Sequence, residues 1–128
     1  MSTTASGTFS VALVPAAPEL DGAIVRFELE KNFQGDLEGS GSGVMLSAGD
    51  PAAGSAGYVA IEVVRGTLHG HPGGFAFAQL GLMHDGAQTL HYEIVPGSGD
   101  GELAGITGVL QLSIDEDGTH RFVLTYDL

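Results

Sequence analysis

The sequence has no cysteine and no tryptophan, and only four of its 128 side chains carry a fixed positive charge: Arg26, Lys31, Arg65 and Arg121. The lack of cysteine excludes disulfide bonds, thiolate metal sites and cysteine-based catalysis. The formal net charge of -12 repels phosphate backbones and anionic lipids, so we expect no nucleic-acid partner and no membrane partner. No apolar run is long enough for a membrane helix or a signal-peptide core, which favours a cytoplasmic protein.

The composition indicates one β-rich globular domain. Hydrophobic residues make up 43% of the chain, which excludes disorder, and 21 glycines disfavour helices. We therefore expect a single domain over residues 1–128, with residues 1–6 flexible.

Short extended segments follow one another from end to end, separated by turn residues. The strongest turn signal is Asp85-Gly86 between two β-rich runs, because a type I′ turn needs positive φ at both central residues. Such short connections force neighbouring strands to be antiparallel. The sequence thus predicts eight strands, at Gly7–Val14, Ala23–Phe33, Asp36–Ser47, Gly57–Gly70, Gly74–His84, Ala87–Val95, Gly108–Ile114 and His120–Asp127.

Eight consecutive antiparallel strands form either a closed barrel or a sandwich. The meander order, interrupted by one longer glycine-rich connection at Pro96–Thr107, favours an all-β, eight-stranded antiparallel barrel. We expect that connection to be a flexible rim at the barrel mouth or a tight crossover. Closure also removes the unpaired strand edges that promote aggregation.

The strand at Gly57–Gly70 alternates ambiguously, and register decides which face is inside. A tight turn at His71-Pro72 would place Leu68 opposite Phe75 and Glu62 opposite Gly81, so that Glu62 faces the interior. Val59, Ile61 and Val63 would then form an apolar stripe outside, which is typical of a subunit interface. We therefore expect a homo-oligomer, either a dimer or a trimer.

Four stretches resemble a known family: Lys31–Gly39 (KNFQGDLEG), Gly54–Glu62 (GSAGYVAIE), Gly66–Gly70 (GTLHG) and Pro96–Gly105 (PGSGDGELAG). The chain is similar over nearly its whole length to a bacterial family of unknown function, the DUF3224-like family of allene-oxide-cyclase-like barrels. The resemblance implies a calycin-like, usually oligomeric barrel. Allene oxide cyclases and dirigent proteins, which share that barrel, steer the cyclisation or coupling of reactive small molecules without a cofactor. Where members commonly carry Gln-His-x-Gly, this chain has Ala78-Gln79-Leu80-Gly81.

The inner face offers one candidate catalytic group, formed by Glu62, Gln79 and Tyr92. Among apolar side chains the neutral form of Glu62 is favoured, so this residue could act as a general acid or base while Tyr92 and Gln79 orient a substrate oxygen. The same group could instead serve ligand recognition, or be a buried carboxylate that only stabilises the barrel. The candidate ligand-binding residues around it are Ser42, Phe27, Tyr58, Phe75, Phe77, Phe122 and Tyr126.

The other candidates are weaker. Lys31 and Glu38 lie on either side of the Gln34-Gly35 turn, where opposite charges are most simply a structural pair, although they could also bind an acidic ligand group. His69 and His71 lack a third ligand at a convincing distance, so we expect no metal.

These observations lead to a cofactor-independent cyclase or isomerase acting on a hydrophobic, oxygenated small molecule, polyketide- or lipid-like, bound in the barrel lumen. One alternative is a non-catalytic binding barrel that uses the same pocket. Another is a structural oligomerisation module whose lumen is filled by its own side chains.

Overall fold

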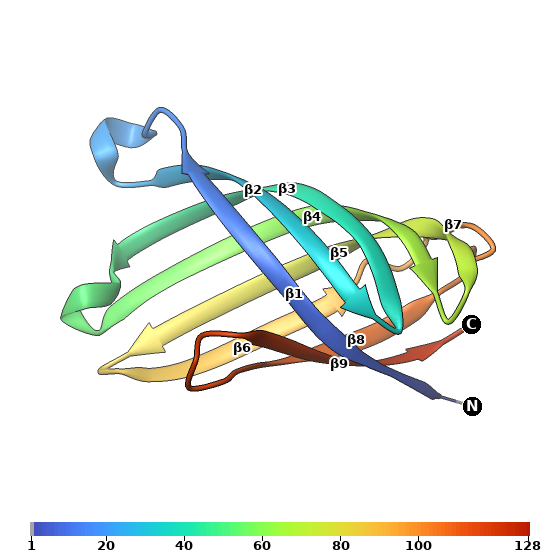
Figure 1. Ribbon diagram of the computed structural model, residues 1–128. Coiled ribbons are helices and arrows are strands. Elements are labelled where there is room, and N and C mark those ends of the chain that lie inside the picture. The colour runs from blue at the N-terminus through green and yellow to red at the C-terminus, as the bar shows by residue number, and fades with distance from the viewer. Residues whose placement is uncertain (1) are drawn as a thin grey trace.

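The computed structural model describes residues 2–128 as a β-barrel with almost no helix (Figure 1). The two 3₁₀ turns, η1 (Leu20–Gly22) and η2 (Pro51–Ala53), lie at one end, called here the helical end. Both chain termini lie at the opposite, terminal end. The strands are β1 (Thr3–Pro15), β2 (Val25–Gly35), β3 (Leu37–Asp50), β4 (Ser55–Leu68), β5 (His71–His84), β6 (Ala87–Ile94), β7 (Asp100–Gly101), β8 (Thr107–Ile114) and β9 (His120–Asp127).

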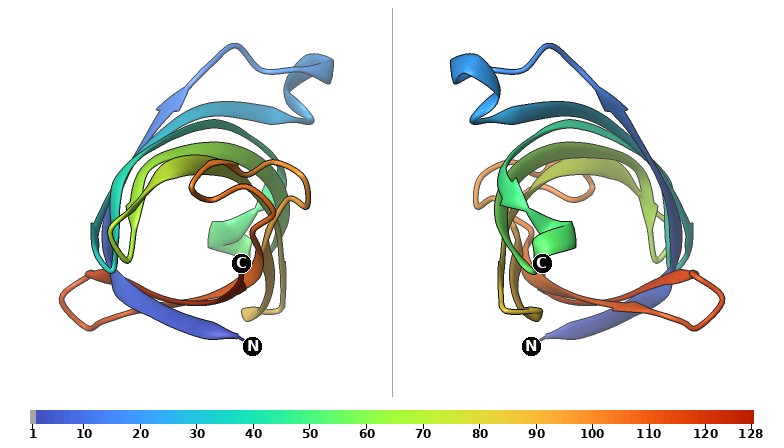
Figure 2. Two further views of the ribbon diagram at one scale, coloured as in Figure 1. Left: turned by 90° about the vertical axis from the view of Figure 1, so that its right-hand side faces the viewer. Right: turned by 90° about the vertical axis from the view of Figure 1, so that its left-hand side faces the viewer.

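The strands form one closed sheet, which confirms the predicted eight-stranded antiparallel barrel. Their order is β4-β3-β2-β1-β9-β8-β6-β5, and pairing of β4 with β5 closes the ring seen end-on in Figure 2. The short β7 is an additional strand that pairs with β5 at Gly73 and Gly74. β1 begins at Thr3, earlier than the predicted Gly7, because residues 3–6 pair with the end of β9.

Turn geometry sets the register on both sides of β5. The Asp85-Gly86 turn has positive φ at both residues and places Gln79 opposite Tyr92, as predicted. The predicted turn at His71-Pro72 is wrong, because the chain reverses at His69-Gly70, where both residues again have positive φ. Leu68 consequently pairs with His71 rather than Phe75, and Glu62 with Phe77 rather than Gly81. This shift of register is an even number of residues, so Glu62 still faces the interior.

The terminal half of the barrel is filled by a hydrophobic core. Its largest fully buried side chains include Phe75, Phe77 and Phe122. Leu103 and Ile106, in the connection between β6 and β8, are buried in the same cluster. That connection was expected to be a flexible rim or a crossover, but its two apolar side chains close the terminal end of the barrel.

The helical half is open, because two pairs of neighbouring strands separate there. β1 pairs with β9 only over Thr3–Phe9, and β6 pairs with β8 only at Glu93 and Val109. As a result the inward-facing Val11, Leu13 and Leu90 remain between 37% and 45% exposed. We call this apolar inner surface the open half; it consists of Val11, Leu13, Phe27, Met45, Tyr58 and Leu90.

The outer face of β4 carries the predicted apolar stripe. Val59, Ile61 and Val63 are between 48% and 53% exposed. The outward-facing neighbours on β3 and β5 extend the stripe into an uncharged surface, called here the apolar face, which consists of Val44, Leu46, Val59, Ile61, Val63, Leu80 and Leu82. Among residues 2–128, no helix is long and apolar enough to cross a membrane.

Candidate functional site

Four polar side chains meet inside the barrel, between the filled and the open half. They are Lys31 from β2, Glu62 from β4, Gln79 from β5 and Tyr92 from β6, and we call them the polar cluster. Glu62 is fully buried, and Lys31 is only 5% exposed. Burying charged groups in this way is costly unless they are paired and hydrogen-bonded.

One carboxylate oxygen of Glu62 organises the cluster. Its Oε1 lies 3.0 Å from the Lys31 ammonium and accepts a hydrogen bond of 3.1 Å from the Gln79 amide. The Tyr92 hydroxyl donates to the same oxygen and also accepts from Lys31 Nζ at 2.8 Å. Three donors from three strands therefore converge on a single atom.

Strand register explains why these side chains meet. Gln79 lies directly opposite Tyr92 on the neighbouring strand, and Lys31 lies opposite Gly41. The inner face of β3 carries Gly41 and Gly43 where other strands carry large residues, and Gly43 is opposite Glu62. A Cβ at Gly41 would lie 3.4 Å from Glu62 Oε2, so the glycine leaves room for the carboxylate.

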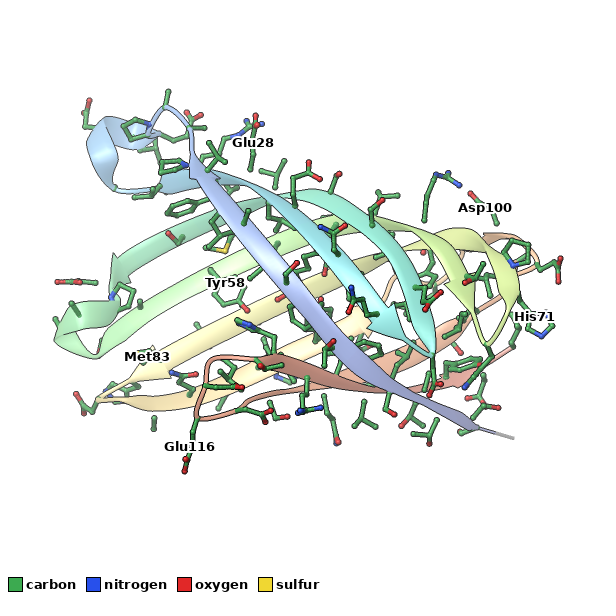
Figure 3. All side chains as sticks on the ribbon, viewed as in Figure 1. Glu28, Tyr58, His71, Met83, Asp100 and Glu116 are labelled. Atoms are coloured by element: carbon green, nitrogen blue, oxygen red, sulfur yellow. The ribbon has the colours of Figure 1, made fainter. Side chains whose placement is uncertain are left out.

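The second oxygen of Glu62 and the phenol of Tyr58 lie on either side of these contacts. Glu62 Oε2 is buried and finds no hydrogen-bond partner among the described residues. Tyr58 donates a 3.0 Å hydrogen bond to the Gln79 amide oxygen, and its ring lies against Gly81. Tyr58 is labelled in Figure 3, toward the helical end. The cluster thus has one free acceptor, which lies beside Gly41, and one half-buried phenol that belongs to the open half.

Burial and the Glu62 carboxylate shift the ionisation of the groups around it. Burial lowers the pKa of Lys31, and the neighbouring carboxylate partly offsets this effect. Burial raises the pKa of Tyr92, and the Glu62 charge adds to the shift. The same two causes raise the pKa of Tyr58. Both phenols are therefore held in their neutral, proton-donating form.

Lys31 is the member of the polar cluster that the sequence analysis misplaced. The predicted pair with Glu38 is wrong, because Lys31 pairs with Gly41 across the strands and its side chain points into the lumen. Its ammonium also lies 4.8 Å from the centre of the Phe9 ring and 5.0 Å from that of Tyr92. The lumen therefore contains a cation stabilised by two aromatic rings.

The structure brings Glu62, Gln79 and Tyr92 together as predicted, but it divides the expected ligand-binding residues. Phe27 and Tyr58 belong to the open half and are partly buried. Ser42 is wrongly placed in the prediction: it is exposed on the outer face of β3 and donates to Glu30 at 2.8 Å. The remaining four, Phe75, Phe77, Phe122 and Tyr126, are buried within the core cluster.

A second group of titratable residues lies at the terminal end. The His69 ring hydrogen-bonds the Tyr126 hydroxyl at 2.6 Å and lies 3.6 Å from Asp36 Oδ2. These contacts join the turns after β2 and β4 to the last strand, which is a structural role. Over residues 2–128, no three His, Asp or Glu side chains are grouped so that they could hold a metal ion.

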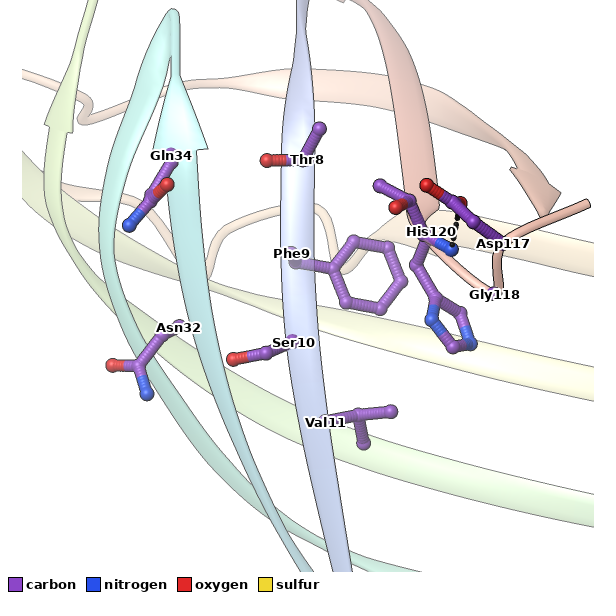
Figure 4. Close-up of a pocket in the computed structure, with 10 residues that line it drawn as sticks. Thr8, Phe9, Ser10, Val11, Asn32, Gln34, Asp117, Gly118 and His120 are labelled. Atoms are coloured by element: carbon purple, nitrogen blue, oxygen red, sulfur yellow. Dashed lines mark hydrogen bonds between the residues drawn. The ribbon is translucent and has the colours of Figure 1, made fainter. Parts of the chain in front are cut away.

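Two hollows mark the places where the barrel strands separate. One, of about 490 Å³, lies between β1–β2 and the 115–119 turn, and Figure 4 shows Phe9 and His120 side by side in its wall. The other, of about 310 Å³, lies between β6 and β8 and includes Tyr92 among its lining residues. The hollow at the seam between β6 and β8 thus reaches the polar cluster at Tyr92.

Together the fold and the polar cluster define an antiparallel β-barrel with an ionisable interior. The chain belongs to the DUF3224 family of proteins of unknown function, whose sequence model matches residues 5–126. A solved structure from the same family, a protein of unknown function from Shewanella oneidensis MR-1, is 41% identical. It superimposes with a TM-score of 0.94 over 100% of this chain and 98% of that one. None of the curated proteins matches the chain.

Proposed function

We propose that the barrel binds a small, largely apolar, oxygen-bearing molecule in its open half and rearranges it as a cofactor-independent cyclase or isomerase. The observation that supports this proposal is the position of the polar cluster beneath the partly exposed apolar inner surface. Such a site binds the carbon skeleton through the open half and the oxygen through a few convergent polar groups.

Each part of the site has a distinct role in this proposal. The open half holds the substrate in a conformation close to the transition state. Glu62 moves a proton, while Tyr92 and Gln79 hold the substrate oxygen. Lys31 adds a positive charge that stabilises negative charge developing on that oxygen.

A non-catalytic binding barrel is the second candidate. It is favoured by one observation, that Oε1 of Glu62 already accepts hydrogen bonds from three donors. A network satisfied in this way can act as a fixed recognition element. In that case Oε2, which has no partner in the described chain, would accept the ligand's hydroxyl.

Native mass spectrometry of the freshly purified protein tests whether the open half holds a ligand. We expect an apolar metabolite that is retained under mild conditions and released on denaturation. Calorimetric titration with 1-decanol then tests the site directly. Binding should weaken in Glu62→Gln and remain unchanged in Glu28→Gln, which makes the same substitution on the outer face of β2. A protein that carries no metabolite and does not bind 1-decanol would contradict the proposal.

If a metabolite is recovered, Glu62→Gln also separates the two candidates. A cyclase or isomerase would lose more turnover of that metabolite in the variant than its weaker binding explains. A binding barrel would leave the metabolite chemically unchanged with either protein.

We also propose that the chain forms a homo-oligomer by packing its apolar face against that of a second copy. The seven residues of this face expose roughly 500 Å², which is comparable to the largest patches on monomeric proteins. Apolar patches of this size are often functional. The chain has a net charge of -12, but the seven residues of this face are uncharged, so their contact brings no like charges directly together.

The charge variant Ile61→Lys tests the assembly, because Ile61 is at the middle of the apolar face. Light scattering should show a dimer or trimer for the wild type and a smaller species for the variant. Leu128→Lys, which changes an equally exposed apolar residue at the C-terminus, is the control. A monomeric wild type at high concentration would overturn this proposal.

A further inference from the structure

Lys31 is the only lysine in the sequence. In a chain of this kind lysine is expected on the surface, where its ammonium is hydrated. Here the one lysine side chain is enclosed by three residues: the carboxylate of Glu62, the hydroxyl and ring of Tyr92, and the ring of Phe9. The only other amine of the protein is its N-terminus.

Stability alone explains this arrangement poorly. A buried ion pair is often no more stabilising than apolar side chains of the same volume, because both charges lose their hydration. The surrounding core is otherwise apolar, and Leu29, next on the inner face of β2, shows that an aliphatic side chain fits this strand. Burial also lowers the pKa of Lys31, which makes the free, nucleophilic amine more accessible at neutral pH.

We propose that the ligand of this barrel is an aldehyde or ketone with an apolar chain, and that Lys31 binds it covalently as an imine. This inference rests on the proposed binding function, since it names the class of molecule that occupies the open half. The apolar chain of the ligand lies against the open half, and the carbonyl carbon of the ligand reaches Lys31 Nζ in the polar cluster.

The polar cluster holds each group that imine formation needs. Lys31 first passes one proton to the Glu62 carboxylate, with which it is in contact at 3.0 Å. The free amine then adds to the carbonyl carbon and gives a carbinolamine. Protons from the nitrogen and from Glu62 leave with the hydroxyl oxygen as water. One ammonium and one carbonyl thus become one protonated imine and one water, and Glu62 returns to its carboxylate form.

The product fits the same surroundings as the lysine that formed it. Glu62 is the counter-ion of the protonated imine, and the Phe9 and Tyr92 rings that lie over the ammonium also stabilise the new cation. Glu62 Oε2, buried without a partner within residues 2–128, can accept the carbinolamine hydroxyl. A protonated imine withdraws electrons from the adjacent carbon, so the same carboxylate is placed to remove a proton from it.

Reductive trapping tests the proposal. The protein is incubated at neutral pH with decanal and sodium cyanoborohydride, and the modified residue is located by peptide mass spectrometry. We expect one decyl group on Lys31, formed faster than any on the N-terminal amine, and protection by 1-decanol. The variant Lys31→Arg keeps the positive charge but has no primary amine on that side chain. It should therefore carry no decyl group at position 31, while its circular-dichroism spectrum remains that of the folded protein.

Each alternative result has a defined meaning. Binding of 1-decanol without a label on Lys31 would overturn imine formation and leave the binding function intact. Failure of 1-decanol to bind would overturn the proposed function as well. Labelling of the N-terminus alone, or labelling of Lys31 that 1-decanol does not reduce, would overturn the claim that the open half delivers the carbonyl to Lys31.

Discussion

Replacing Lys31 by methionine should destabilise the protein strongly, although methionine fills a similar volume. The substitution removes the only cation from the cluster and leaves the carboxylate of Glu62 buried with two neutral donors, Gln79 and Tyr92. Tyr92 also loses the hydrogen bond that it accepts from Lys31. The variant therefore contains a buried charge without a counter-charge, which is among the costliest defects that a single substitution creates.

The magnitude follows from what remains around Glu62. Breaking a buried ion pair by removing one partner costs about 3–5 kcal/mol. Because two neutral donors still contact Oε1, we expect a value near the lower end, about 3 kcal/mol. With a urea m-value of about 2 kcal/mol per molar, this loss lowers the denaturation midpoint by roughly 1.5 M.

Equilibrium urea denaturation followed by circular dichroism measures this loss. Arg65→Met is the matched control, since Arg65 pairs with Asp100 in solvent and its removal should cost about 0–1 kcal/mol. Adding Glu62→Leu to Lys31→Met should recover part of the stability, because the unpaired charge disappears. If Lys31→Met were as stable as Arg65→Met, the idea that the lumen contains an ion pair would be refuted.

Three further predictions concern the groups around the cluster. Gly81→Ala should lower the free energy of unfolding by about 1–3 kcal/mol, because its Cβ would lie 2.3 Å from a Tyr58 ring carbon. Thermal denaturation measures this loss. The control Gly41→Ala should lose less stability, because its Cβ would lie 3.3 Å from the nearest atom. Tyr58→Phe removes the hydrogen bond to Gln79 and should cost about 1 kcal/mol in urea denaturation without changing the fold. Burial raises the pKa of Tyr92, so above about pH 10 the unfolded chain releases a phenolic proton that the folded chain keeps. The free energy of unfolding should therefore fall as the pH rises through that region, and Tyr92→Phe should make the fall shallower; an equally steep fall in the variant would contradict this origin.

The barrel could be predicted from local sequence because its signals are local. The Asp85-Gly86 turn fixes the pairing of β5 with β6, and alternation identifies the inner faces of β2, β5 and β9. The turn between β4 and β5 was misplaced because Pro72 suggested a turn. Proline also occurs near the first residue of a strand, and Pro72 lies there in β5. The error left Glu62 on the correct face only because the displacement was even.

The polar cluster was predicted in part. Strict alternation along β2 already places Lys31 between the inward-facing Leu29 and Phe33, but the opposite charge of Glu38 across the Gln34-Gly35 turn favoured a cross-strand pair instead. The inward glycines of β3 were a second signal, since small residues on an inner face leave space for larger partners. The convergence of three donors on one oxygen, and the unpartnered second oxygen, depend on side-chain geometry that no sequence pattern encodes. Ser42 was misplaced because Lys31 pairs with Gly41, three residues beyond the expected Glu38, and an odd displacement of register reverses the faces of β3.

The pairing of β1 with β9 has a consequence for how the barrel is assembled. Thr3 lies opposite Tyr126, so the contact that completes the ring joins the two most distant strands of the chain. During synthesis β1 can associate with β2 early, but its other edge remains available for incorrect partners until β9 has emerged. A circular permutant that links the neighbouring termini and opens the chain at Asp85-Gly86 would turn this slow closure into a local hairpin. It would transfer the long-range step to β5 and β6, whose paired inner residues then meet last.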